Sequence, residues 1–126
     1  PGLNESKVVD TVGGEVDIMP TIANLMDLDT KQPYVFGHDL LNADEGFIAQ
    51  ISYVGEGSFI TSDDNMLFTI GKDGTVGSGR LISLLDGSRK NLNEKLCQKY
   101  SDRAQSLIDT CKEVLDNNLI ANYITH

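Results

Sequence analysis

Residues 46–86 read "GFIAQISYVGEGSFITSDDNMLFTIGKDGTVGSGRLISLLD", and this stretch decides the fold. Four runs of apolar and β-branched residues are separated by turns rich in Gly, Asp and Asn, a pattern typical of strands. Parallel neighbours would need crossovers of about a dozen residues or more. The short connections therefore predict an antiparallel four-stranded meander. The expected strands are residues 46–55, 58–62, 65–71 and 80–86.

Two connections in this stretch carry strong hairpin signals. Residues 63–65 (Asp-Asp-Asn) and 72–74 (Lys-Asp-Gly) are types that tolerate positive φ. The glycine-rich run "GKDGTVGSG" at 71–79 superficially resembles a phosphate-binding loop. It lacks the P-loop spacing and lies between two expected antiparallel strands, so a hairpin connection is the favoured interpretation.

The last third of the chain has the periodicity of one long amphipathic helix. A helix of this kind needs a surface to cover, and the apolar face of the sheet is the natural one. Ser101 and Asp102 would alternatively begin a second helix, which is the less favoured prediction. The expected apolar stripe is Leu92, Leu96, Tyr100, Ala104, Leu107, Ile108, Cys111, Val114 and Leu115, opposite a polar face of Lys95, Lys99, Asp102, Arg103, Asp109 and Glu113.

The two cysteines, Cys97 and Cys111, both fall in this expected helix. At about 1.5 Å per residue a single helix separates them by roughly 21 Å. A disulfide requires Cα atoms within about 7 Å, so we predict two free, partly buried thiols.

The region before the sheet contains one further helix, expected over residues 17–28. Asp17 is placed to cap its first turn, and Pro20 lies within that turn, where its missing N–H is tolerated. Ile18, Ile22, Leu25 and Met26 follow at helical spacing. Residues 1–10 read as a loop with weak strand character at 8–9, and residues 31–45 as an ordered loop.

Composition indicates a globular domain and excludes some partners. The 126 residues carry a formal net charge of -9, which disfavours nucleic acid and anionic membrane surfaces. The chain has no signal peptide and no apolar run long enough to span a bilayer. We therefore predict no nucleic-acid binding and no direct membrane segment in this chain.

Motifs for catalysis are absent from the sequence. The two histidines are His38, in a loop, and His126. His38 and Asp39 are candidate metal ligands, but a dipeptide is not a metal-binding motif, and a loop histidine without a metal is the favoured interpretation. The acid pairs at 44–45 and 63–64 fall in turns, where acids are common for local reasons. The residues alone predict a fold and no reaction.

Several motifs carry a family resemblance. They are "PGLNES" at 1–6, "DIMPT" at 17–21, "LDTK" at 28–31, "GHDL" at 37–40 and "GSFIT" at 57–61. Together they resemble the sulfatase-like branch of the alkaline phosphatase superfamily, and within it most closely the lipoteichoic acid synthases and related phosphoglycerol transferases. The resemblance is specific over residues 1–61 and weaker beyond them.

The resemblance implies a large extracellular α/β domain, held in the intact protein by transmembrane helices at the outer face of a bacterial membrane. A metal-bound threonine would transfer glycerol phosphate from phosphatidylglycerol to a growing polymer, with a divalent cation, typically manganese. In the family, that threonine and the metal ligands precede the segment matched here. The resemblance therefore assigns no catalytic residue, metal ligand or cofactor to this chain, which we expect to be inactive alone.

The family likeness also gives an expected organisation. Residues 1–42 would end the catalytic domain, with structural roles for Asp17, Pro20, Thr21, Gly37 and Asp39. Residues 45–126 would form an α+β subdomain, a four-stranded antiparallel sheet covered by the long helix. The expected partner is the missing N-terminal catalytic domain, and a helix 17–28 left uncovered would favour a homodimer.

Two alternatives stay open at this point. The chain would be part of an arylsulfatase or a phosphoethanolamine transferase of the same superfamily, which the upstream nucleophile would decide. It would otherwise be a stand-alone extracellular module that binds a cell-wall polymer or a protein.

Overall fold

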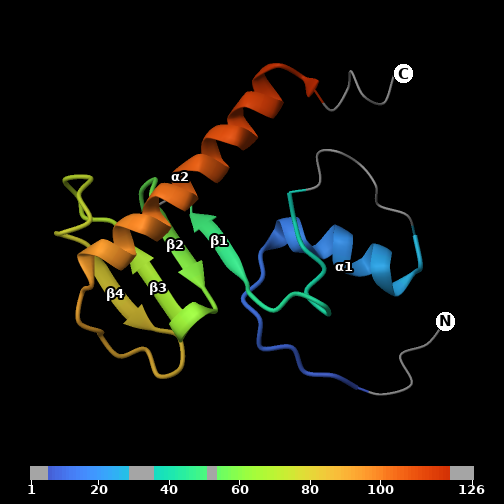
Figure 1. The fold of residues 1–126 in the computed structure, drawn as a ribbon, viewed down its shortest axis with the longest axis horizontal. Coiled ribbons are helices and arrows are strands. Elements are labelled where there is room, and N and C mark those ends of the chain that lie inside the picture. Colours follow the sequence, from blue (N-terminus) through green and yellow to red (C-terminus); the bar gives the residue numbers. More distant parts are fainter. Residues whose placement is uncertain (1–5, 29–35, 51–53, 120–126) are drawn as a thin grey trace.

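The structure, a computed structural model, describes residues 6–28, 36–50 and 54–119. It is an α+β fold in which a four-stranded antiparallel sheet packs against a long C-terminal helix, with a short helix before the sheet (Figure 1). The fold class predicted from the sequence is confirmed. In chain order the elements are the 3₁₀ turn η1 (Glu15–Asp17), α1 (Ile18–Leu25), β1 (Phe47–Gln50), β2 (Ser58–Thr61), the 3₁₀ turn η2 (Asp63–Asn65), β3 (Met66–Thr69), β4 (Arg80–Ser83) and α2 (Glu94–Asp116).

The sheet is the predicted meander. Its strands follow the order β1-β2-β3-β4, and each neighbouring pair is antiparallel. Each strand has four residues, so the strands are shorter than the apolar runs suggested. Residues 51–53 of the first predicted strand lie outside the described residues.

Both hairpin predictions are confirmed. Asp64 and Asn65 adopt φ values of 53° and 45°, and Gly74 has a φ of 76°. The glycine-rich run connects antiparallel strands β3 and β4, so it is a hairpin connection.

The core lies between the sheet and α2. Phe59 and Phe68, from the two central strands, are fully buried and stack with ring centroids 5.2 Å apart. Tyr100 of α2 meets Phe59 at 5.2 Å, and Phe47 of β1 extends the aromatic row at 5.8 Å from Phe59. Aromatic pairs at such separations add about 0.5–1.5 kcal/mol beyond their buried area.

The long helix is a single element, so the alternative second helix at Ser101 is wrong. Asn93 caps it by accepting a hydrogen bond from the backbone N–H of Leu96 at 3.2 Å. Two members of the predicted stripe, Leu107 and Leu115, are exposed instead of buried. Leu107 lies at the margin of the stripe, and Leu115 lies near the helix end, which extends beyond the sheet (Figure 1).

The cysteine prediction is confirmed. Both residues lie in α2 and both are free. Cys97 is buried, and burial raises the pKa of its thiol, whereas Cys111 is partly exposed.

The first helix differs from its predicted range. It begins with η1, and α1 ends at Leu25, three residues earlier than expected, before Asp27 adopts a φ of 53°. Only Pro20 and Ala23 of α1 are buried. Its apolar stripe is largely exposed, including Ile22 at 49%. The weak strand expected at residues 8–9 does not form.

Candidate functional site

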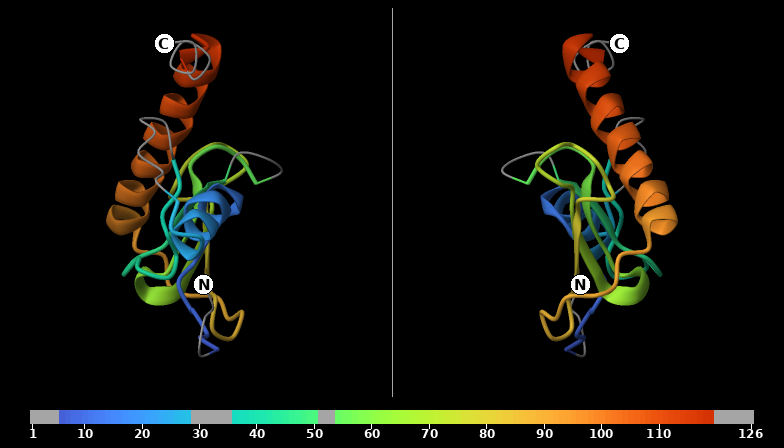
Figure 2. Two further views of the ribbon diagram at one scale, coloured as in Figure 1. Left: turned by 90° about the vertical axis from the view of Figure 1, so that its right-hand side faces the viewer. Right: turned by 90° about the vertical axis from the view of Figure 1, so that its left-hand side faces the viewer.

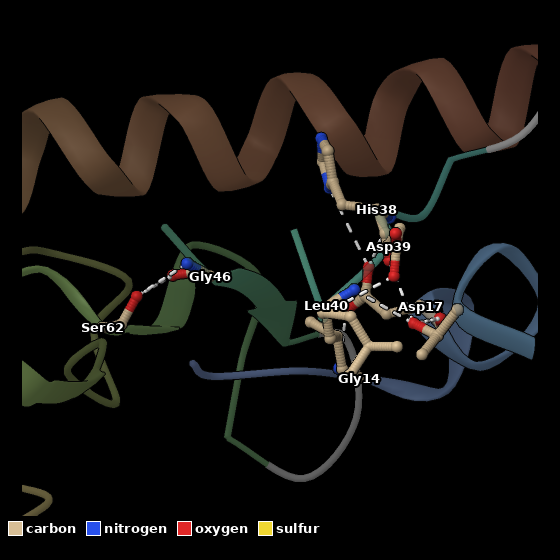
Figure 3. Close-up of polar contacts among 9 residues, drawn as sticks. Gly14, Asp17, His38, Asp39, Leu40, Gly46 and Ser62 are labelled. Carbon is tan, nitrogen blue, oxygen red and sulfur yellow. Dashed lines mark hydrogen bonds and ion pairs between the residues drawn. The ribbon is translucent and has the colours of Figure 1, made fainter. Parts of the chain in front are cut away.

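The residues singled out from the sequence meet where the start of α1 contacts the loop that leads into β1 (Figure 3). We call this region, residues 10–21 together with 37–46, the joint. At its centre Asp17 is 5% exposed. Its Oδ2 accepts the backbone N–H of Gly14 at 2.8 Å, and its Oδ1 accepts that of His38 at 2.8 Å. One buried carboxylate thus holds together two segments that are distant in sequence.

Asp17 occupies the N-cap position of α1 as predicted, but its side chain makes no capping hydrogen bond to that helix, which corrects the expected role of the carboxylate. A capping residue normally has extended φ and ψ, so that its side chain reaches forward to the free N–H groups. Asp17 instead has φ -86° and ψ -13°, because the preceding η1 turn already winds the chain. Its side chain points back to Gly14 and across to the loop.

Thr21 and Pro20 lie one turn further along the helix. The Thr21 hydroxyl donates to the carbonyl of Asp17 at 2.6 Å and accepts the N–H of Leu40 at 3.0 Å. This is a second attachment between α1 and the loop. Pro20 is buried in the first turn, where its lack of an N–H costs no helical hydrogen bond.

Gly37 and Asp39 shape the loop side of the joint. A Cβ on Gly37 would lie 1.9 Å from the carbonyl oxygen of Val16, so this close approach requires glycine. Asp39 accepts the N–H of Leu41 at 3.0 Å and also a hydrogen bond from the side-chain amide of Asn42. Its carboxylate thereby stabilises the turn that follows.

The joint continues to the sheet through two residues that sequence reasoning missed. A Cβ on Gly46 would lie 1.8 Å from the carbonyl oxygen of Val12. The N–H of Gly46 donates to Oγ of Ser62 at 2.6 Å, which attaches the loop to the end of β2 (Figure 3). Glycine immediately before an apolar strand was the available signal for Gly46. Ser62 had none.

Two acidic side chains of the joint, Asp17 and Asp39, are committed to hydrogen bonds. Both oxygens of Asp17 accept backbone N–H groups, and Asp39 is engaged in its own turn. The ring of His38 is exposed, with Nδ1 3.9 Å from Oδ1 of Asp17. Across residues 6–28, 36–50 and 54–119 no group of three or more His, Cys, Asp or Glu side chains could hold a metal ion.

A polar contact outside the joint links α2 to the η2 turn between β2 and β3. The Tyr100 hydroxyl donates to Oδ2 of Asp63, and this bond, aided by burial, raises the pKa of Tyr100 to about 12. Such a phenol is a poor proton donor near neutral pH. Beside it, the guanidinium carbon of Arg103 lies 4.3 Å from the centroid of the Phe47 ring. Both contacts position the helix.

No protein-family model matches the sequence, but the chain is similar to individual known proteins. It is similar to "Lipoteichoic acid synthase-like YvgJ" of Bacillus subtilis, with 25% identity over 95% of the chain and 18% of the relative. It is also similar to "Lipoteichoic acid synthase" of Staphylococcus saprophyticus, with 27% identity over 98% of the chain and 17% of the relative. The chain thus spans less than a fifth of these curated relatives.

A solved structure agrees in fold. The lipoteichoic acid synthase LtaP from Listeria monocytogenes matches with a TM-score of 0.77 and 27% identity, over 93% of this chain and 27% of that one. The chain is homologous to the lipoteichoic acid synthases. Among the described helices, none combines the length and the apolar character needed to cross a membrane.

Proposed function

We propose that this chain, a homologue of the lipoteichoic acid synthases, is the C-terminal, non-catalytic portion of a sulfatase-family phosphoglycerol transferase. The whole protein would transfer glycerol phosphate from phosphatidylglycerol to a growing cell-wall polymer. The observation that carries this proposal is the similarity itself, which runs over at least 95% of the chain in both curated relatives while covering under a fifth of each.

The chemistry of the described residues supports a non-catalytic role. Both oxygens of Asp17 accept backbone N–H groups, and both oxygens of Asp39 accept hydrogen bonds within its own turn, so these two carboxylates serve structural contacts. A phosphoryl transferase needs a divalent cation and a positioned nucleophile. We place both, with manganese as the cation, in the preceding part of the whole protein.

The cellular location follows from the same proposal. We infer that a polymer built from membrane phosphatidylglycerol would be assembled at the outer face of a bacterial membrane. We propose that the whole protein acts there, anchored by a segment outside this chain, and that residues 1–42 complete its catalytic domain while 45–126 form the adjoining subdomain.

The test is an activity assay on two polypeptides, the 126-residue chain and the product of its complete reading frame. With manganese and vesicles containing phosphatidylglycerol, we expect diacylglycerol release by the complete product and none by the chain alone. Turnover by the isolated chain would refute the non-catalytic role. Hydrolysis of an aryl sulfate, or transfer from phosphatidylethanolamine, by the complete product would favour the other superfamily branches.

We further propose that the isolated chain self-associates through α1. Ile18, Ile22 and Met26 expose about half of their side-chain surface in the single chain, and burial of such apolar area drives association. Sedimentation equilibrium should give a dimer that Ile22→Asp dissociates. A monomer at all concentrations would contradict this.

A further inference from the structure

The sheet has an apolar row on the face opposite α2. Residues facing α2, such as Phe59 and Phe68, alternate with residues that face away. The strand register aligns one outward residue from each strand: Ile48 pairs with Ile60, Ile60 with Leu67, and Leu67 with Ile82. We call these four aliphatic residues the outer row.

An outer row of this kind is unusual for a solvent-facing sheet. An antiparallel sheet with one wet face normally carries polar side chains there. Here the central outward position of every strand is Ile or Leu, and all four residues are partly exposed. None of them belongs to the core cluster or packs against it.

No described helix covers this face. Figure 2 shows the sheet from its sides, with α2 along one face. α1 lies beyond the β1 edge (Figure 1). The sheet therefore has one buried face and one apolar face that is left open by the described residues.

The chain itself indicates what covers the outer row. A Cβ on Gly14 would lie 3.5 Å from Cγ1 of Ile48, so the N-terminal segment reaches one end of the row. The joint fixes that segment against the strand through the close approach of Val12 and Gly46. The homologues hold more than four-fifths of their length outside the matched region. Residues 12–14 thus lie beside the β1 end of the outer row, and most of a homologue's length is available to cover the rest of it.

We propose that the outer row is the surface on which the preceding domain of the same polypeptide packs, so that the sheet lies between α2 and that domain. This rests on the proposed function for the existence of that domain, and goes beyond it by assigning the face. The polar side of α2 then remains in water, which suits the exposed Lys95, Lys99 and Asp109.

Cysteine labelling tests the assignment. Single substitutions Ile60→Cys and Leu67→Cys are made in a Cys111→Ser background, where the remaining Cys97 is fully buried. Ser106→Cys, on the exposed side of α2, is the matched control. Circular dichroism of each isolated variant first establishes that it folds, and Ile48→Cys replaces any variant that does not. Each cysteine is then labelled in the isolated chain and in the product of the complete reading frame.

We expect outer-row cysteines to react at least about tenfold more slowly in the complete product than in the isolated chain, and Ser106→Cys to react equally in both. Equal reactivity of the outer-row cysteines would overturn the inference, even if the complete product shows transferase activity. Protection already present in the isolated chain carrying Ile22→Asp, together with a doubled mass, would overturn it by assigning the face to a second copy. Protection without transferase activity would sustain the inference and refute the proposed function.

Discussion

We expect the carboxylate of Asp17 to be the main link between the start of α1 and the loop before β1. The substitution Asp17→Asn measures its contribution to the stability of this contact. The substitution keeps the size of the side chain and one acceptor oxygen. It replaces the other oxygen by an amide group, which is itself a donor. One of the two N–H groups now satisfied, that of Gly14 or that of His38, is then left facing a donor.

The magnitude follows from the geometry. A hydrogen bond to a charged group contributes about 1.5–3 kcal/mol, and a donor left buried without an acceptor costs a similar amount. Both N–H groups lie 2.8 Å from an oxygen of a side chain that is 5% exposed. We expect Asp17→Asn to lower the free energy of opening the joint by about 2–3 kcal/mol, which is roughly a 30- to 140-fold change in the opening equilibrium.

The assay is amide hydrogen exchange, which reports local opening residue by residue. The backbone amide of His38 or of Gly14 should exchange faster by the factor given above, while the amide of Phe68 in the core changes little. Glu15→Gln is the matched control, because it removes the same charge from the same turn at an exposed position. If both joint amides change by less than about threefold in Asp17→Asn, or by as much in Glu15→Gln, the reasoning is refuted.

Three further predictions follow from the described contacts. Gly46→Ala should destabilise the chain by about 3 kcal/mol or more in urea unfolding, because its Cβ would meet a carbonyl oxygen at 1.8 Å, whereas Gly14→Ala, with its nearest neighbour at 3.5 Å, should cost under about 1 kcal/mol. The pKa of Tyr100 is raised from 10.0 to about 12, so the hydrogen bond of its neutral form stabilises the fold fully below pH 10. This stabilisation should be lost as the pH rises from 10 to 12. In thermal melts, Tyr100→Phe should abolish this part of the pH dependence. A thiol reagent should modify Cys111 in the native protein and Cys97 only upon unfolding, and equal rates would contradict the buried position of Cys97.

The strength of periodic signals explains which parts of the fold were predictable. Strand alternation and helical spacing are repeated over many residues, so the meander and the single helix α2 were visible even though Leu107 and Leu115 were assigned to the wrong surface. Their exposure depends on where the sheet ends beneath the helix. That is a property of packing and not of spacing.

The joint was only partly predictable, for a different reason. Asp17 was recognised as important, yet its partner on the loop, the N–H of His38, is 21 residues away. A capping rule considers only the residues that follow in the helix, so it chose the wrong donors. The contact of Ser62 with Gly46 likewise depends on the pairing of β1 with β2. A single serine in a turn does not indicate which backbone group it will bind.

The close packing at Gly46 has a mechanical consequence. Its backbone lies in close contact with Val12 and donates a hydrogen bond to Ser62. The residue before β1 is therefore held by two separate segments. We expect such a connection to be rigid and not to act as a hinge. We expect a displacement of Val12 to pass to Gly46 at the start of β1 and, through its bond to Ser62, to the end of β2.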